Sequence, residues 1–307
     1  MATRALIVGG SLSGLMNGIL LHQAGWDVEI YERVAEDLSG RGGGIATQDA
    51  LWEVIAGTGI DVTARPGVRL GRRVVYASDG SVVAEQPTTQ VVSSWDTLYR
   101  LLIKYLPHER YHQGVSVTGA VQDAGGAVLQ TEDGPCATAD LVVAADGQGS
   151  TLRSVLLPEL APDYAGYVAW RGLVDEASLD SATRAALVDA MAFCTPVGEQ
   201  MLAYTVPGAD DDLRPDHRRQ NFVWYRPAPC CATGSPGATG RCMNRRSRLP
   251  RSVTRLSKRY AKTRSGCCRR HSRRWCARRR TRSFSRSATC AARGWRSAAS
   301  PWSATPR

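Results

Sequence analysis

The sequence predicts an α/β protein whose first domain holds a parallel sheet, and three observations predict it. Residues 5–8 are an apolar run short enough for a buried strand, and a glycine-rich turn and a helix-period pattern up to Ala24 follow them. Gly25 is a typical helix stop, and a second apolar strand at residues 28–32 comes after it. Residues 141–147 form another buried strand that ends in a turn. Strands that alternate with helices in this way pair in parallel.

The first turn carries a dinucleotide-binding pattern. Residues 9–14 read Gly-Gly-Ser-Leu-Ser-Gly, and Glu32 stands eighteen positions beyond Gly14. Gly9 permits a tight turn, and Gly14 lets the helix pack closely against the strand. The free amides at the helix start can face a pyrophosphate, and the Glu32 carboxylate can accept hydrogen bonds from a ribose. Ser11 replaces the middle glycine of the pattern, and a buried strand, turn and helix without a ligand is the alternative interpretation.

Charge divides the 307-residue chain into two compositions. Residues 230–307 contain twenty Arg and two Lys and no acidic residue, so removing these 22 charges from the total of +11 leaves −11 on residues 1–229. Seven of the nine cysteines also follow residue 229. Because we find no signal segment and no apolar run of about eighteen residues, we expect a cytoplasmic protein with reduced thiols and no membrane partner.

The middle of the chain continues with a glycine-dense loop, residues 40–44, and a helix-like pattern that extends to Ile55. Such a loop lets the backbone lie against a ligand face, although a flexible surface loop is the alternative. Ser94 is placed to cap a helix that carries Leu98 and Tyr105 on one side. Hairpin turns are predicted at residues 79–80, 125–126 and 133–134.

The strand at residues 141–147 brings Asp146 and Gly147 to the sheet edge where open α/β proteins bind ligands. Asp146 would hydrogen-bond a cofactor hydroxyl there, and an ordinary Asp-Gly turn is the alternative. A second sheet is predicted from aromatic and β-branched runs, with a helical pattern over residues 177–192 between them. The predicted strands of this sheet are residues 164–174, 201–206 and 221–225.

Taken together, these motifs resemble the single-component FAD-dependent aromatic hydroxylases, which are the class A flavoprotein monooxygenases. The motifs are residues 9–14 with Glu32-Arg33, Gly43-Gly44-Ile45 with Gln48, and residues 145–150 with Arg153. Within this class, residues 93–100 and 164–172 are most similar to the 2,6-dihydroxypyridine 3-monooxygenase group. The resemblance covers residues 3–229.

The resemblance implies that FAD lies with its ADP half on the first turn and Glu32, while the segment around Gly44 passes near the flavin ring. It also implies that Asp146 interacts with FAD and NAD(P)H, and that reduced flavin and O2 form a C4a-hydroperoxide that hydroxylates the substrate. The cofactor carries this chemistry, so no catalytic side chain is assigned. In many relatives an Arg stands where Trp95 stands here, which leaves Arg100 as a candidate flavin or phosphate contact. The implied cofactor-binding residues are Gly9, Gly10, Ser11, Leu12, Ser13, Gly14, Glu32, Arg33, Gly44, Ile45, Gln48, Arg100, Asp146 and Gly147.

We therefore expect an enzyme that uses NAD(P)H and O2 to hydroxylate a small aromatic or N-heteroaromatic substrate similar to a dihydroxypyridine. Trp170 and Arg171 are candidates for a substrate wall, and core packing or a surface ion pair would explain them equally well. No metal and no specific nucleic acid is expected, and a homodimer is left open. The expected domains are 1–68, the first part of the FAD-binding domain; 69–92, a β-hairpin excursion; 93–160, its second part; 161–229, a substrate-domain β-sheet; and 230–307, a disordered Arg- and Cys-rich tail.

The tail lacks the third motif that the resemblance requires, a strand that ends in Gly-Asp-Ala-Ala. When the codons for Trp295 to Arg307 are regrouped by one base, the genetic code permits a run that ends in this motif. We therefore predict that the reading frame is lost between Pro227 and Arg241, that the tail has no evolved structure or function, and that activity is impaired.

Two alternatives stay open from the sequence, nucleic-acid binding and a different oxidoreductase, whereas the spacing disfavours a third, a zinc site. The basic tail attracts nucleic acid through its arginines. A zinc site would use cysteines and a histidine of the tail, although their spacing contains no C-x-x-C pair; these residues are Cys267, Cys268, His271 and Cys276. An FAD- or NAD(P)-dependent oxidoreductase without oxygen insertion fits the first motif equally well.

Overall fold

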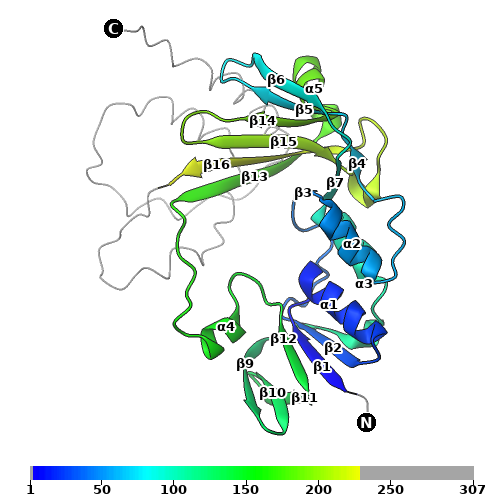
Figure 1. The fold of residues 1–307 in the computed structure, drawn as a ribbon, viewed down its shortest axis with the longest axis vertical. Coiled ribbons are helices and arrows are strands. Elements are labelled where there is room, and N and C mark those ends of the chain that lie inside the picture. Colours follow the sequence, from blue (N-terminus) through cyan, green and yellow to red (C-terminus); the bar gives the residue numbers. More distant parts are fainter. Residues whose placement is uncertain (1–2, 229–307) are drawn as a thin grey trace, which may run out of the picture.

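The computed structural model describes residues 3–228. Figure 1 shows two layered parts, one built on a parallel sheet with helices beside it and one built on a larger second sheet. The predicted α/β class and the predicted second sheet are both confirmed. The predictions of disorder and a shifted frame for residues 230–307, and the alternatives of nucleic-acid binding and a zinc site there, concern residues outside those described.

The first sheet has the order β12-β1-β2-β8, and all of its neighbouring strands are parallel. Its strands are β1 (Arg4–Val8), β2 (Asp27–Glu32), β8 (Tyr111–Gln113) and β12 (Leu141–Ala144). Helix α1 (Leu12–Gln23) connects β1 to β2, and Gly25 follows it with a φ of +86°, as a helix stop requires. The register pairs Val8 with both Tyr31 and Ala144, so three strands end at one edge of the sheet.

Both faces of β1 are covered, which explains why its apolar run is continuous. Ala5 and Ile7 pack into the core beneath α1, α2 (Asp49–Gly57) and α3 (Trp95–Ile103), whereas Leu6 and Val8 pack on the opposite face. That opposite face is covered by a three-stranded antiparallel sheet and by α4 (Thr151–Leu156). The strands of this small sheet are β9 (Val117–Asp123), β10 (Gly126–Thr131) and β11 (Gly134–Ala139).

The second sheet has six strands in the order β13-β16-β15-β14-β5-β6. Its strands are β13 (Tyr167–Asp175), β16 (Arg219–Pro227), β15 (Gln200–Val206), β14 (Ala190–Cys194), β5 (Arg72–Tyr76) and β6 (Val82–Pro87). The hairpin of β5 and β6 belongs to this sheet because β5 pairs in parallel with β14, far along the chain. A further sheet, β3-β7-β4, lies between the two parts (Figure 1), and its strands are β3 (Gly44–Ala46), β7 (Val91–Ser94) and β4 (Val68–Arg69).

The helical pattern predicted over residues 177–192 is partly wrong. Helix α5 covers only Ser181–Leu187, and the chain continues as strand β14 from Ala190. Asp189 adopts a φ of +59° between the two elements, and its carboxylate accepts a hydrogen bond from the Gly71 amide at 2.8 Å. The extended backbone of Val188 ends the helix before the turn at Asp189, and pairing with β5 and β15 then holds the next residues as a strand.

The predicted hairpin turns and the predicted helix cap are confirmed. The three predicted hairpin turns join β5 to β6, β9 to β10 and β10 to β11. Ser94 is the N-cap of α3, and its hydroxyl accepts a hydrogen bond from the Thr97 amide at 2.9 Å. Over residues 3–228, the helices are too short or too polar to cross a lipid bilayer.

Candidate functional site

The turn after β1 has a conformation and a closeness of approach that require glycine. Gly9 has a φ of +105°, and a Cβ on it would lie 2.4 Å from the carbonyl oxygen of Ala145. A Cβ on Gly14 would lie 1.8 Å from the carbonyl oxygen of Gly9. These distances are far below van der Waals contact, so the two glycines let α1 and the end of β12 approach the end of β1. The sequence pattern therefore marks a real close approach of three backbone segments.

The start of α1 is available to an anion. Ser11 is the N-cap residue with an extended backbone, and within the described chain its side chain makes no capping hydrogen bond. The first turn of the helix also contains no acidic residue. The first amides of a helix have no partner inside the helix, and the helix dipole favours negative charge beside them. The amides of residues 12–14 therefore form a suitable place for a phosphate.

Glu32 connects this turn to β2. The side chain is 7% exposed, and its Oε2 accepts a hydrogen bond from the Gly10 amide at 2.8 Å while Oε1 accepts one from the Val34 amide at 2.9 Å. Each carboxylate oxygen has a second lone pair, so the acid keeps the capacity to accept hydrogens from a ribose. The sequence predicted the ribose contact, and the structure adds a role in holding the backbone of the turn.

Asp146 lies beside the same turn, because a Cβ on Gly9 would be 2.9 Å from its Cα. Its Oδ2 accepts hydrogen bonds from the amides of Thr151 at 2.7 Å and Leu152 at 3.2 Å, at the start of α4. Its Oδ1 is buried and has no hydrogen-bond partner among residues 3–228. A buried carboxylate oxygen without a donor is unfavourable, and a hydroxyl group of a ligand would satisfy it.

The glycine loop, residues 40–44, contacts the second sheet. The Gly44 amide donates a hydrogen bond to Asn221 Oδ1 on β16 at 2.9 Å, and a Cβ on Gly44 would lie 2.5 Å from a ring carbon of Tyr204 on β15. A Cβ on Gly43 would lie 3.8 Å from a guanidinium nitrogen of Arg171 on β13. The loop therefore has the sheet residues Asn221, Tyr204 and Arg171 on one side.

Asn221 and Tyr204 were not singled out from the sequence, since alternation along a strand is the only signal they carry. Asn221 is 1% exposed, and its Nδ2 has no hydrogen-bond partner in the described part of the chain. Tyr204 is 3% exposed, and burial raises its pKa to about 12, although the nearby Arg171 opposes the shift. Its hydroxyl is therefore protonated at neutral pH and able to donate a hydrogen bond.

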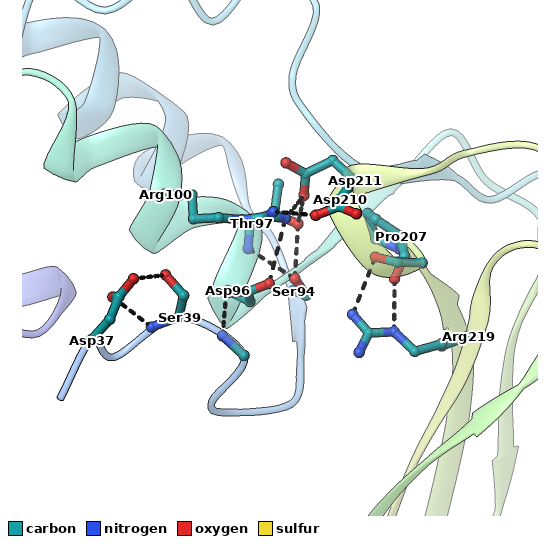
Figure 2. Close-up of polar contacts among 12 residues, drawn as sticks. Asp37, Ser39, Ser94, Asp96, Thr97, Arg100, Pro207, Asp210, Asp211 and Arg219 are labelled. Carbon is teal, nitrogen blue, oxygen red and sulfur yellow. Dashed lines mark hydrogen bonds and ion pairs between the residues drawn. The ribbon is translucent and has the colours of Figure 1, made fainter.

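Arg100 on α3 lies against the turn that precedes β16 (Figure 2). Its guanidinium pairs with Asp211 at 2.7 Å, with Asp96 at 3.4 Å and with Asp210 at 3.6 Å. The Thr97 hydroxyl donates to the same Asp211 oxygen at 2.6 Å. Carboxylates of this chain therefore surround the cation that was predicted to contact flavin or phosphate, and that predicted role stays a prediction.

The start of α3 also holds the glycine loop. The Gly40 amide donates to Asp96 Oδ1 at 2.6 Å (Figure 2), and the Trp95 amide donates to the Gly43 carbonyl oxygen at 2.9 Å. Helix α3 thus contacts the turn between β15 and β16 through Arg100 and Thr97, and it contacts the glycine loop through its first residues.

Apart from Arg100, the predicted site residues lie in three places. The turn at residues 9–14, Glu32 and Asp146 meet at one edge of the first sheet. Gly44 and Ile45 lie in β3, where Gly44 contacts the second sheet. Arg33, Gln48 and Gly147 are exposed. Their roles as cofactor contacts all stay predictions.

These observations fit a dinucleotide cofactor. The glycine cradle leaves room for a backbone approach, the uncapped helix start suits a pyrophosphate, and the unpaired Asp146 oxygen suits a hydroxyl. The fold and this site define a dinucleotide-binding protein.

Comparison with known families gives the next step. The model of the FAD binding domain family matches residues 2–161, and a model described as FAD binding domain-like matches residues 164–243. The chain belongs to the FAD-binding domain family, and FAD is the cofactor of its first domain.

Relatives with a named activity are similar to this chain. The 2,6-dihydroxypyridine 3-monooxygenase of Paenarthrobacter nicotinovorans is 33% identical over 222 residues, which is 72% of this chain and 55% of the relative. The solved structure of 2,6-dihydroxypyridine-3-hydroxylase from Arthrobacter nicotinovorans matches with a TM-score of 0.68 and 32% identity, over 74% of this chain and 57% of that one. The Klebsiella pneumoniae protein HpxO, solved with FAD and uric acid, matches with a TM-score of 0.63 and 25% identity, over 76% and 58%. The chain thus spans little more than half the length of these relatives.

Proposed function

We propose that this chain is an FAD-dependent monooxygenase that hydroxylates a small aromatic or N-heteroaromatic ring, with NAD(P)H and O2 as co-substrates. The observation that carries the proposal is the contact between the glycine loop and the second sheet, at Gly44 and Asn221. This contact places a polar sheet surface beside the cofactor domain. The names of the relatives favour a dihydroxypyridine-like ring as the substrate.

The first domain would hold FAD with the groups described above. The amides at the start of α1 would bind the pyrophosphate, and the carboxylates of Glu32 and Asp146 would accept hydrogens from its hydroxyl groups. FAD would supply the redox chemistry, namely acceptance of a hydride from NAD(P)H and activation of O2. The protein would supply orientation and exclusion of water.

The residues of the second sheet would bind the ring. The Tyr204 hydroxyl is protonated at neutral pH, as in an ordinary tyrosine, and burial raises its pKa further, to about 12, so it would donate a hydrogen bond to a substrate oxygen. Arg171 brings a positive charge to the same side of the loop, and this charge would favour the ionised form of a hydroxylated ring. An ionised ring oxygen makes the ring more electron-rich, which favours transfer of an oxygen atom to it.

The proposal is tested with the full chain, purified with added FAD. We expect a flavin absorption spectrum, oxidation of NADH or NADPH that 2,6-dihydroxypyridine stimulates, and a product that carries one atom from 18O2. Oxidation of NAD(P)H that yields only hydrogen peroxide, with no labelled product from any hydroxylated ring, would favour an oxidoreductase without oxygen insertion. Absence of FAD binding both in this chain and in a chain with the restored frame would refute the proposal.

We also propose that residues 230–307 come from a shifted reading frame and that the absence of the third motif weakens FAD binding. The sequence supports this, since these residues contain no Gly-Asp-Ala-Ala motif. Reading the nucleotide sequence around codons 227–241 decides the matter, and a chain with the restored frame should bind FAD more tightly. Location in the cytoplasm stays a prediction, and the oligomeric state stays open.

A further inference from the structure

The Gly10 residue of the first turn is held from both sides. Its amide donates to Glu32 Oε2 at 2.8 Å, and its carbonyl oxygen accepts a hydrogen bond from the Tyr111 hydroxyl at 2.9 Å. A Cβ on Gly10 would lie 2.1 Å from that hydroxyl oxygen, so the tyrosine closes directly on the backbone. Tyr111 is the first residue of β8 and belongs to none of the sequence motifs.

This contact fixes the direction of the next amide. In a trans peptide the carbonyl oxygen of one residue and the N–H of the next point in opposite directions. The Gly10 carbonyl points at Tyr111, so the Ser11 N–H points away from it. Ser11 is the N-cap residue of α1, and its amide precedes those of residues 12–14. Tyr111 therefore determines the orientation of the peptide that opens the anion-binding end of the helix.

The tyrosine is itself held firmly. β8 pairs with β2, which places Tyr111 opposite Ile30. Its hydroxyl is hydrogen-bonded with that of Tyr99 on α3, and the Tyr99 ring stacks on Trp95 with centroids 5.0 Å apart. Burial raises the pKa of Tyr111. The hydroxyl has a single proton, which it donates to the Gly10 carbonyl oxygen, so its oxygen is the acceptor in the hydrogen bond with Tyr99.

We propose that Tyr111 is a positioning residue for the cofactor, because its hydroxyl sets the Gly10–Ser11 peptide in the orientation that a pyrophosphate needs. This inference rests on the binding of FAD in the proposed function. A turn that already has the bound orientation costs less free energy on binding. With phenylalanine at position 111, the Gly10 carbonyl loses its donor and the peptide gains freedom to rotate, while the ring and its packing remain.

The test compares Tyr111→Phe with a matched control, Tyr76→Phe. The Tyr76 hydroxyl donates to the Ala186 carbonyl oxygen at 2.8 Å, which is a bond of the same type that joins β5 to α5, away from the first turn. FAD affinity is measured in the full chain by quenching of flavin fluorescence. Loss of one hydrogen bond of this kind should weaken FAD binding about 3- to 10-fold in Tyr111→Phe. Tyr76→Phe should bind FAD as the wild type does.

Hydrogen–deuterium exchange of the protein without FAD gives a second readout. Tyr111→Phe should speed exchange in the peptide covering residues 7–16, and Tyr76→Phe should leave that peptide unchanged. Equal FAD affinity in the two variants, or unchanged exchange at residues 7–16 in Tyr111→Phe, overturns the inference. If neither the wild-type chain nor a chain with the restored frame binds FAD, the proposed function fails, and the exchange result alone then decides whether Tyr111 orders the turn.

Discussion

Replacement of Gly14 by alanine tests the close approach of α1 to the first strand. The new Cβ would lie 1.8 Å from the Gly9 carbonyl oxygen and 3.0 Å from the Gly9 carbonyl carbon. Both atoms belong to the backbone, and the Gly9 amide is itself bonded to the Tyr31 carbonyl oxygen at 2.8 Å. Rotation of a side chain therefore gives no relief, and the helix must move away from the strand.

The magnitude follows from two opposing effects. Overpacking of a tight core costs about 1–3 kcal/mol, and the upper end applies because backbone must shift. Alanine gains about 1 kcal/mol over glycine in a helix. We therefore expect Gly14→Ala to lower the free energy of unfolding by about 2 kcal/mol. The displaced helix start should also weaken FAD binding.

The assay is equilibrium unfolding in urea, with Gly57→Ala as the control. Gly57 ends α2 and is exposed, and a Cβ added to it would meet no other atom within 4 Å. The same substitution there should stabilise the protein by about 0.5–1 kcal/mol. A Gly14→Ala variant that is as stable as Gly57→Ala, with unchanged FAD affinity, would refute the reasoning.

Three further predictions concern single side chains. Asp211→Asn removes a partly exposed charge beside Arg100, so it should cost less than about 1 kcal/mol in urea unfolding, and 1 M NaCl should abolish the difference. Asn221→Ala leaves the buried Gly44 amide without its acceptor and should cost about 1–3 kcal/mol, measured in the same way; an unchanged midpoint would contradict this. Burial by itself would raise the pKa of Glu29, but hydrogen bonds from Tyr31 and Arg4 lower that pKa below its usual 4.5. Its stabilising contribution is therefore present above pH 4.5 and lost as the pH falls below it. The free energy of unfolding of Glu29→Gln should therefore fall less steeply than that of the wild type as the pH is lowered below 4.5. An equally steep fall in the two proteins would contradict this.

Local chemistry made much of the fold predictable from the sequence. The turn at residues 9–14, the cap at Ser94 and the three hairpin turns depend on neighbouring residues, and the structure has them where the sequence predicts them. Helix α5 ends early because Val188 is already extended and the residues after Asp189 pair with distant strands. Propensity gives way to long-range pairing at such places.

The candidate site was predictable only in part, for the same reason. Glu32 and Asp146 stand at strand ends, and strand ends meet at one edge of a parallel sheet. Tyr111 and Asn221 act through contacts with Gly10 and Gly44, each more than 100 positions away in the chain. No spacing in the sequence connects residues that only the folded chain brings together.

Helix α3 has a consequence for engineering. It contacts Asp211 in the turn between β15 and β16, and Gly40 and Gly43 in the glycine loop. Its residue Tyr99 is also hydrogen-bonded with Tyr111, which holds the first turn. The second sheet could be replaced by that of a relative in order to change which aromatic ring binds. Such a replacement would break the contacts that α3 makes. Grafts that carry the matching α3 with the new sheet should keep flavin affinity better than grafts of the sheet alone.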